Sequence, residues 1–349
     1  MTNFLTSQFA ILNKTKSPLV IKNLRIPELK KNQLLVEIKY SYVCGSQLNE
    51  IFGLKGKDKH LPHTLGHEGS GIIRSIGKNI KDIKTGDRVV LSWITNKKNN
   101  SSNPYYLDNK NKIINSGLVS TFSKFAIVSS NRVYKINNNN VPLDIAALLG
   151  CASPTGFGIV LKHITNFDKK YFVGIYGAGG VGLMSLIALN FLGIKNIYVI
   201  DKNKKNLRIA KDFGCKYAVT NEQFINKVIG KKININQIKY NLEMSGNKKM
   251  MAQAINILST SGTVILAGNI KKGEFVDLNP YDLIFGKKIF GFSANNISLN
   301  KNLKLYLKIL QKINYKKLRK IFKVYKLNHI NKAISDFKSG KVIRPLIKL

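Results

Sequence analysis

A glycine-rich turn restricts the possible folds of this 349-residue chain more than any other feature of its sequence. Residues 177–182 read Gly-Ala-Gly-Gly-Val-Gly. An apolar segment that we predict to be a strand precedes them at 172–176, and a helix is predicted at 180–192. A strand that leads through a glycine turn directly into a helix starts a βαβ unit, so we expect a parallel sheet here.

The six residues of this turn fit the pattern G-x-G-x-x-G, in which each glycine has a physical reason. Gly177 permits the tight turn, Gly179 lets a pyrophosphate approach the backbone, and Gly182 lets the helix pack closely on the strand. The helix N-terminus at Gly180 and Val181 then offers free N–H groups and a partial positive charge to phosphates. The turn therefore predicts a dinucleotide site.

Asp201 supplies the second half of this signature. It ends a strand predicted at 197–200 and lies 19 residues after Gly182. A carboxylate at this place can bind both hydroxyls of the adenosine ribose and repels a 2′-phosphate, which predicts NAD as the cofactor. The alternative is a glycine turn of another parallel fold, with Asp201 as a helix N-cap. The register of strand, glycines, helix and acid favours the dinucleotide site.

The rest of the chain shows two different patterns. The first 150 residues or so are mostly predicted strands, among them 34–43, 71–77, 87–93 and 122–128. From about 153, strands and helices alternate, which indicates a parallel sheet covered on both faces; after 197–200 come a helix at 204–213, strands at 216–219, 239–243 and 262–267, and helices at 221–229 and 247–258. The polar stretch 96–116 predicts a long surface loop.

The last fifty residues are expected to return to the first domain. They contain a predicted helical segment after 299, a strand at 322–326, a helix near 328–338 and a terminal strand. A further strand candidate, residues 288–293, is apolar and lies near the expected edge of the parallel sheet. An uncovered edge tends to find a partner, so we expect a homo-oligomer, a dimer or tetramer; an ordinary interior strand is the alternative.

The net charge of +39 has two interpretations. It could reflect a polyanionic partner, such as nucleic acid or an acidic membrane. It could also reflect codon bias, because Lys, Asn and Ile share AT-rich codons and all three are abundant. The lysines are scattered along the whole chain instead of lying on one segment with interleaved aromatics, which favours codon bias. We expect no specific nucleic-acid partner.

Three cysteines are too few, and odd in number, for a disulfide framework, and this indicates a reducing compartment. The first residues lack the pattern of a signal peptide. Residues 171–194 carry no charge and are long enough to span a bilayer, but their six glycines fit a strand, a turn and a helix better. We expect a cytoplasmic protein that does not enter the membrane.

Two of the cysteines and one histidine form a candidate metal site. The thiolates of Cys44 and Cys151 and the imidazole of His67 suit zinc, and three ligands leave a fourth position for water or substrate. A structural zinc would be closed by a fourth protein ligand. Each residue also has an ordinary explanation, since buried cysteines are common and a lone histidine is often only hydrogen-bonded.

Several segments resemble the zinc-containing alcohol dehydrogenases of the medium-chain dehydrogenase/reductase superfamily. The signature G-H-E-x-x-G with a later glycine matches residues 66–71 and Gly77. Residues 44–46 and 149–158 resemble the segments with the first and third zinc ligands, and residues 86–89 and 340–344 resemble further family segments. The resemblance covers nearly the whole chain.

The resemblance implies an α/β fold with two domains. A GroES-like, mostly β catalytic domain would comprise residues 1–152 and 294–349. A Rossmann domain with a doubly wound parallel sheet would comprise residues 153–293 and bind NAD. The implied reaction is the reversible oxidation of an alcohol to an aldehyde or ketone by hydride transfer to NAD, with zinc as the Lewis acid.

The resemblance also implies a role for each site residue. Cys44, His67 and Cys151 would hold one catalytic zinc. Glu68 is expected close behind the metal, and Ser46 is expected to start a proton relay. Trp93 is expected to form an aromatic wall of the substrate pocket. Arg344 is expected to contact the cofactor pyrophosphate.

The chain departs from the family in three places. Residues 94–120 contain none of the four cysteines of the family's structural zinc, so we expect that second metal to be absent. Gln47 and Asn49 stand where the family has Asp and His. Asn49 does not titrate near neutral pH, so it can hold a water or the ribose but cannot act as the base that ends the relay.

Two other functions stay open at the level of sequence. One is a zinc-free, NADPH-dependent quinone or enoyl reductase on the same fold. The other is a basic nucleic-acid-binding protein that has lost catalysis. The complete ligand set, Cys44, His67 and Cys151, argues against both. The alcohol substrate itself is not set by the sequence, because pocket walls come from distant segments.

Overall fold

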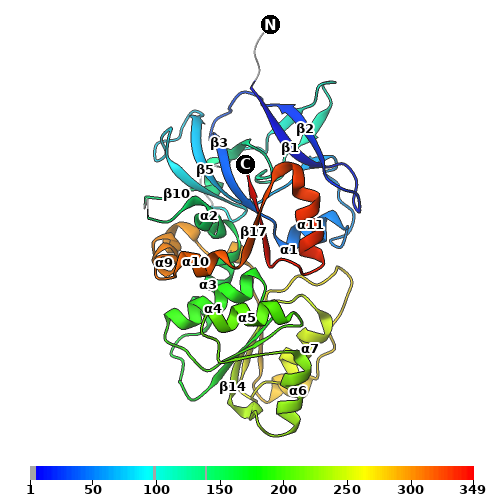
Figure 1. The fold of residues 1–349 in the computed structure, drawn as a ribbon, viewed down its shortest axis with the longest axis vertical. Coiled ribbons are helices and arrows are strands. Elements are labelled where there is room, and N and C mark those ends of the chain that lie inside the picture. Colours follow the sequence, from blue (N-terminus) through cyan, green and yellow to red (C-terminus); the bar gives the residue numbers. More distant parts are fainter. Residues whose placement is uncertain (1–4, 97–99, 138–139) are drawn as a thin grey trace. The chain divides into compact units, whose positions relative to one another are not determined.

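The computed structural model describes residues 5–96, 100–137 and 140–349, which divide into two compact units. Unit 1 comprises Met1–Cys151 and Ser298–Leu349, and unit 2 comprises Ala152–Ile297 (Figure 1). The last segment of the chain thus returns to the first unit, as expected.

Unit 1 is built mainly from strands. Its strands are β1 (Thr6–Leu12), β2 (Val20–Arg25), β3 (Gln33–Tyr42), β4 (His63–Thr64), β5 (Glu68–Ile76), β6 (Arg88–Ser92), β7 (Tyr105–Leu107), β8 (Ile113–Asn115), β9 (Phe125–Ser129), β10 (Val133–Lys135), β17 (Phe322–Lys326) and β18 (Arg344–Lys348). Its α-helices are α1 (Gly45–Ile51), α2 (Leu143–Ala146), α9 (Leu299–Gln311), α10 (Tyr315–Arg319) and α11 (Ile330–Lys338), and 3₁₀ turns occur at Ser130–Arg132, Ala147–Gly150 and Leu327–His329.

These strands form a closed barrel and a larger sheet. The barrel order is β1-β2-β7-β8-β4, and the sheet order is β10-β6-β5-β3-β18-β17, with β9 also paired to β3. The central strand β3 is apolar along most of its length, and its Leu34, Val36 and Ile38 belong to the core cluster between these elements. Cys44 follows β3 closely, Glu68 is the first residue of β5, and Trp93 directly follows β6.

The prediction of a surface loop at 96–116 is wrong in part. Strands β7 and β8 pair antiparallel and complete the barrel between β2 and β4. Tyr106 is fully buried, its ring lies 4.3 Å from that of Phe9, and its hydroxyl accepts a hydrogen bond from the Ile127 amide at 3.1 Å. Asp108 accepts from the amides of Lys110 and Lys112 and so closes the hairpin turn. An apolar core and a carboxylate therefore shape this segment.

Unit 2 is a six-stranded parallel sheet with helices on its two faces (Figure 1). The strand order is β13-β12-β11-β14-β15-β16. The strands are β11 (Phe172–Tyr176), β12 (Ile197–Ile200), β13 (Tyr217–Val219), β14 (Ile238–Glu243), β15 (Thr263–Leu266) and β16 (Lys288–Gly291). The helices are α3 (Ala152–His163), α4 (Gly180–Phe191), α5 (Lys204–Asp212), α6 (Asn221–Ile229), α7 (Lys248–Asn256) and α8 (Pro280–Ile284), and 3₁₀ turns occur at Ile235–Gln237 and Ala294–Asn296.

The core of unit 2 explains why its strands are so easily recognised in the sequence. On one face Phe224 of α6 and Ala254 of α7 pack against Tyr176, Ile200 and neighbouring strand residues. On the other face α4 approaches Ile175, so β11 is covered on both sides. A strand that is buried on both faces has a continuous apolar sequence. Of the apolar candidate at 288–293, residues 288–291 form a strand, β16, and it lies at one edge of the sheet.

The uncharged stretch 171–194 forms β11, the glycine turn and α4, as predicted. Within the described ranges, no single helix has both the length and the apolar character needed to cross a membrane; one bent pair, Leu143–Gly150 with Ala152–His163, passes that test on length and composition alone.

Candidate metal centre and dinucleotide turn

Cys44 occupies the N-cap of α1, directly after β3. Its backbone is extended there, with φ −95° and ψ 150°. The amide of Cys44 donates to the side-chain oxygen of the buried Gln47 at 3.3 Å, so Gln47 holds the first turn of α1. Gln47 differs from the residue that the family resemblance suggested, and this structural contact gives it a role.

His67 and Glu68 are placed by the glycine that precedes them. Gly66 has φ +101°, and a Cβ on it would lie 2.4 Å from Thr121 Oγ1 and 2.5 Å from the Phe122 amide nitrogen. Only glycine therefore fits this approach. Glu68 then begins β5. Cys151 follows a 3₁₀ turn that ends at Gly150, where a Cβ would lie 2.5 Å from the Leu91 carbonyl oxygen.

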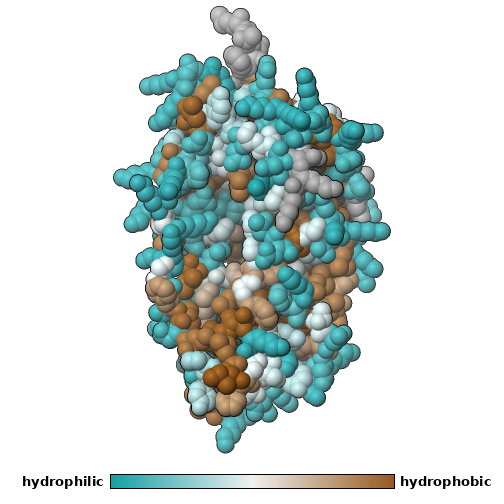
Figure 2. Space-filling model, turned by 180° about the vertical axis from the view of Figure 1, so that it is seen from behind, coloured by the Kyte–Doolittle hydropathy of each residue, from teal (hydrophilic) through white to brown (hydrophobic). Residues whose placement is uncertain are grey.

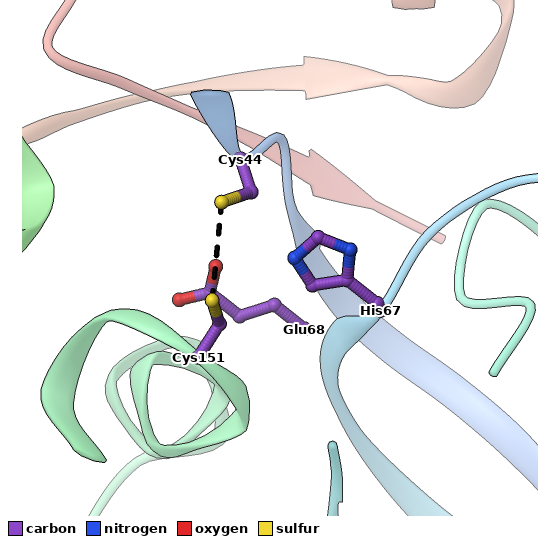
Figure 3. A group of neighbouring side chains, drawn as sticks. All are labelled: Cys44, His67, Glu68 and Cys151. Carbon is purple, nitrogen blue, oxygen red and sulfur yellow. Dashed lines mark hydrogen bonds between the residues drawn. The ribbon is translucent and has the colours of Figure 1, made fainter. Parts of the chain in front are cut away.

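The structure brings the predicted ligands together (Figure 3). Ligand atoms of Cys44, His67, Glu68 and Cys151 all lie within 4.8 Å of one another. The two sulfur atoms are 3.8 Å apart and do not form a disulfide. His67 Nε2 is buried and has no hydrogen-bond partner among the described residues. Two thiols and an imidazole nitrogen without a partner, aimed at one point, are a donor set that fits zinc.

The two thiols are electrostatically coupled. The pKa of Cys44 is held well below its usual value, chiefly because Cys151 donates a hydrogen bond to its sulfur, and His67 acts in the same direction against the effect of burial. The pKa of Cys151 is raised well above its usual value by the neighbouring Cys44 thiolate and by burial. A divalent cation removes this conflict, since it favours both thiolates at once.

Glu68 is fully buried and forms an ion pair with Arg344, which is also buried. The guanidinium lies 5.2 Å from the ring centre of Tyr42. With both thiolates and Glu68 ionised, a divalent metal and Arg344 would neutralise the buried charge. Glu68 thus lies beside the predicted metal ligands, where it was expected. The structure places Arg344 on Glu68, and its contact with a cofactor pyrophosphate stays a prediction.

Ser46, Asn49 and Trp93 lie around this centre. Ser46 and Asn49 are three residues apart on α1 and so share one face of the helix. The Ser46 hydroxyl donates to Cys44 Sγ at 3.5 Å. Trp93 follows β6, and its indole nitrogen donates to Cys151 Sγ at 3.3 Å. No sequence pattern indicated this last contact, because the family resemblance suggested only a pocket wall for Trp93.

In unit 2 the glycine turn has the expected geometry. Gly177 has φ +100°, and a Cβ on Gly182 would lie 1.9 Å from the Gly177 carbonyl oxygen. Gly179 is the N-cap of α4, and a Cβ there meets no heavy atom of the described chain within 4 Å. The turn is therefore tight where the helix meets the strand and open at Gly179, where a pyrophosphate is expected.

Asp201 lies beside this turn. Its carboxylate accepts from the Ala178 amide at 2.7 Å and from the Asn203 amide at 2.7 Å. The side chain of Asn206 donates to it as well, at 3.3 Å. The N-cap of α5 is Asn203, so the alternative explanation of Asp201 as a helix cap is wrong. The carboxylate is held at the carboxyl end of β12, next to the glycines.

Glu243 is a buried acid that the sequence analysis missed. It ends β14, the neighbour of β11, at the point where the strand order reverses. Its carboxylate accepts from the amides of Ser245 and Gly246 and from the Ser245 hydroxyl, and burial raises its pKa. A Cβ on Gly177 would lie 3.0 Å from Ser245 Cα, so Glu243 fixes the loop that packs against the glycine turn. An acid at the end of an apolar strand, with Ser-Gly two residues further on, was the available signal.

Comparison with known proteins gives the same assignment for both units. Residues 30–138 match the family described as alcohol dehydrogenase GroES-like domain, and residues 180–311 match the family described as zinc-binding dehydrogenase. The S-(hydroxymethyl)glutathione dehydrogenase of Saccharomyces cerevisiae is 26% identical over 97% of this chain and 95% of its own length. The alcohol dehydrogenase class-3 of Dictyostelium discoideum is 27% identical over 99% and 98%.

A solved structure agrees with these relatives. Benzyl alcohol dehydrogenase from Acinetobacter calcoaceticus superposes with a TM-score of 0.87, at 25% identity and 99% coverage of both chains. The predicted fold class and enzyme class, an oxidoreductase acting on CH–OH groups, are thereby confirmed. The chain belongs to the zinc-containing alcohol dehydrogenase family of the medium-chain dehydrogenase/reductase superfamily.

Proposed function

We propose that this chain oxidises a small-molecule alcohol reversibly to an aldehyde or ketone, with NAD as hydride acceptor and one catalytic zinc held by Cys44, His67 and Cys151. The observation that carries the proposal is the convergence of two thiols and an imidazole nitrogen without a partner at one buried point. Bound there, zinc supplies a Lewis acid that lowers the pKa of a hydroxyl group.

The residues around the metal site have separate tasks. Ser46, half-buried on α1, accepts the proton of the substrate hydroxyl and passes it on. Asn49 holds the ribose or a water by hydrogen bonds, and bulk water receives the proton, because an amide has no group that titrates near neutral pH. Glu68 and Arg344 balance the buried charge and keep the thiolate pair in place.

The cofactor would bind at the glycine turn of unit 2. The amides of Gly179, Gly180 and Val181 would face the pyrophosphate, and Gly177 and Gly182 give the turn its shape. Asp201 would bind the adenosine ribose and reject NADP, and Arg344 would meet the pyrophosphate. In this proposal residues 1–152 and 294–349 form the catalytic domain and residues 153–293 the cofactor domain.

Exposed side chains near the sheet edge support a homo-oligomer. Large hydrophobic residues are exposed in β16 and in the segment 275–285 around α8, namely Phe275, Tyr281, Ile284, Phe285 and Phe290. Figure 2 shows apolar surface on unit 2. Because β16 is also the edge of the sheet, a second copy can cover apolar surface and edge together. Light scattering at micromolar concentration should show a dimer or tetramer, and a monomer would contradict this part of the proposal.

The proposal also covers the substrate class, the cellular compartment and the absence of a specific nucleic-acid partner. The relatives named above act on S-(hydroxymethyl)glutathione and benzyl alcohol, so a primary alcohol is the first class to test. We place the enzyme in the cytoplasm, without a specific nucleic-acid partner. A screen of primary alcohols, secondary alcohols and polyols with NAD would identify the substrate.

Metal analysis together with turnover tests the function. We expect one zinc per chain in the purified protein and loss of this zinc in a Cys151→Ala variant. Two zinc ions per chain, or full zinc retention in that variant, would contradict the ligand assignment. Activity with NADPH on quinones or enones that survives removal of zinc would point to the zinc-free reductases. A protein with neither zinc nor turnover that binds nucleic acid would support the remaining alternative.

A further inference from the structure

We propose that Trp93 is a positioning residue for the catalytic zinc, which it serves by donating its indole N–H to the sulfur of Cys151. The inference rests on the proposed zinc site. It gives Trp93 a task beyond the aromatic wall that the family resemblance suggests. The task is to hold the third ligand and to draw negative charge away from the metal.

The contact itself is simple. Trp93 Nε1 lies 3.3 Å from Cys151 Sγ, within hydrogen-bond distance for a sulfur acceptor. Cys151 is 7% exposed, so water reaches the sulfur poorly. The indole N–H only donates, so it cannot compete for the metal as a ligand. Once the thiol is ionised the hydrogen bond becomes charge-assisted, and such bonds are roughly twice as strong as neutral ones.

The backbone around Trp93 is tied to the segment that carries Cys151. The hydroxyl of Ser92 donates to the Gly150 carbonyl oxygen at 2.6 Å and accepts from the Ile94 amide at 3.0 Å. The residues on both sides of Trp93 are therefore connected to the residue before Cys151. A Cβ on Gly150 would lie 2.5 Å from the Leu91 carbonyl oxygen, which shows how closely the two segments pack.

A second set of contacts holds the backbone of Trp93 and Ile94. Arg132 donates to the Trp93 carbonyl oxygen, and the Tyr134 hydroxyl donates to the Ile94 carbonyl oxygen at 2.9 Å. Arg132 directly precedes β10 and Tyr134 lies within it, and β10 is the neighbour of β6 in the sheet. These contacts hold the backbone on both sides of the indole, and the indole N–H itself points at the Cys151 sulfur.

As a result, each of the two thiolates has its own hydrogen-bond donor. Cys44 receives the hydroxyl of Ser46 at 3.5 Å, and Cys151 receives the indole N–H. Each sulfur thus receives a hydrogen bond from a side chain that is not a metal ligand. A donor to a thiolate reduces the electron density that the sulfur gives to the metal, which leaves zinc the stronger Lewis acid. Partners of metal ligands typically contribute 10–100-fold to metal affinity.

Trp93 is the only tryptophan of the chain, which permits a sharp test. Growth of a tryptophan auxotroph on β-(3-benzothienyl)alanine replaces only this side chain and exchanges N–H for sulfur in a ring of nearly the same shape. The matched control is 5-fluorotryptophan, which keeps the N–H. The second variant is Trp93→Phe. Zinc affinity is measured by competition with a chelator, and the thiolate-to-metal charge-transfer band is measured after cobalt substitution.

We expect zinc affinity to fall about 10–100-fold with benzothienylalanine and with Trp93→Phe, because the loss of the donor that stabilises the Cys151 thiolate and holds it in place outweighs the stronger donation from the freed sulfur. The cobalt band should move to longer wavelength in both, because a sulfur without the donor gives up its electrons more easily. The 5-fluorotryptophan protein should match the natural one. Unchanged affinity and band with benzothienylalanine would overturn the proposal, as would an equal loss with 5-fluorotryptophan.

The failure of the zinc site and the failure of this inference are distinguishable. If the natural protein binds no zinc, the proposed function falls and this inference falls with it. If zinc binds and the analogue changes nothing, only the role of Trp93 falls. If the altered proteins do not fold, the contact can be tested in the natural protein. The NMR signal of its single indole N–H should then change its chemical shift when cadmium replaces zinc. A signal that does not move would refute the contact.

Discussion

Alanine at Gly179 and alanine at Gly182 should separate cofactor binding from folding. The two glycines lie three residues apart in one turn, yet an added Cβ meets opposite conditions. At Gly182 it would lie 1.9 Å from the Gly177 carbonyl oxygen, whereas at Gly179 it meets no described heavy atom within 4 Å. The first substitution disturbs the chain itself, and the second disturbs only what binds to it.

The magnitudes follow from these distances. An ordinary carbon–oxygen contact needs about 3.3 Å, so Gly182→Ala must push α4 from β11 by more than 1 Å, and overpacking of this kind costs about 1–3 kcal/mol or more. Gly179→Ala changes only an N-cap, at roughly 0.5–1 kcal/mol. For NAD the same methyl group would occupy the approach of the pyrophosphate. Loss of one charge-assisted hydrogen bond, about 1.5–3 kcal/mol, corresponds to roughly 10–150-fold weaker binding.

Two measurements on each protein provide the test. Urea unfolding of the cofactor-free protein gives the stability, and isothermal titration calorimetry gives the Kd for NAD. We expect Gly179→Ala to unfold close to the natural protein and to bind NAD at least tenfold more weakly. We expect Gly182→Ala to unfold at clearly lower urea. A Gly179→Ala protein with unchanged Kd would refute the placement of the pyrophosphate at this turn, and unchanged stability of Gly182→Ala would refute the close packing.

Three further predictions concern specificity, proton transfer and acid stability. Asp201→Ala should narrow the preference for NAD over NADP in kcat/KM. A natural protein that prefers NADP would show that the Asp201 carboxylate does not determine the cofactor preference. Asn49→His should raise the rate below pH 8, by at most about 10²-fold, and add an imidazole-like ionisation to the pH profile; no change while proton transfer limits turnover would remove residue 49 from the path. Burial raises the pKa of Glu37, but hydrogen bonds and charges from Lys39 and Arg74 outweigh it and lower the pKa overall. A carboxyl group whose pKa is lowered in the folded state stabilises the protein at neutral pH, and this stabilisation is lost as the pH falls through that pKa. Glu37→Gln should therefore lower the stability of the protein at pH 7 and have little effect near pH 3, as measured by urea unfolding.

The sequence predicted best where the signal was local. The strand at 172–176 agrees with β11 at both ends, because its apolar run stops at a glycine turn that no strand can continue through. The segment 96–116 was harder. Each strand of its hairpin has three residues, and the partners β2 and β4 lie far away along the chain. Asn and Lys dominate such a segment, and the one deeply buried tyrosine is too little to reveal pairing.

The candidate site shows the same limit. Cys44, His67 and Cys151 were identified through a family resemblance, since their long spacings carry no geometric information of their own. The bond from Trp93 to Cys151 joins residues 58 positions apart, and the pair of Glu68 with Arg344 joins residues 276 positions apart. Contacts of this kind depend on how strands of a sheet are ordered, which no local pattern of side chains determines.

The hairpin of β7 and β8 has a consequence for the order of folding and metal binding. The barrel is closed by Tyr106, Phe9 and their apolar neighbours, and the segment that shapes it contains no cysteine. We therefore expect the scaffold to form without any metal and the ligand set to be assembled beforehand. In that case zinc binding is a separate and reversible step that follows folding, and the folded protein can exist without metal until zinc is supplied.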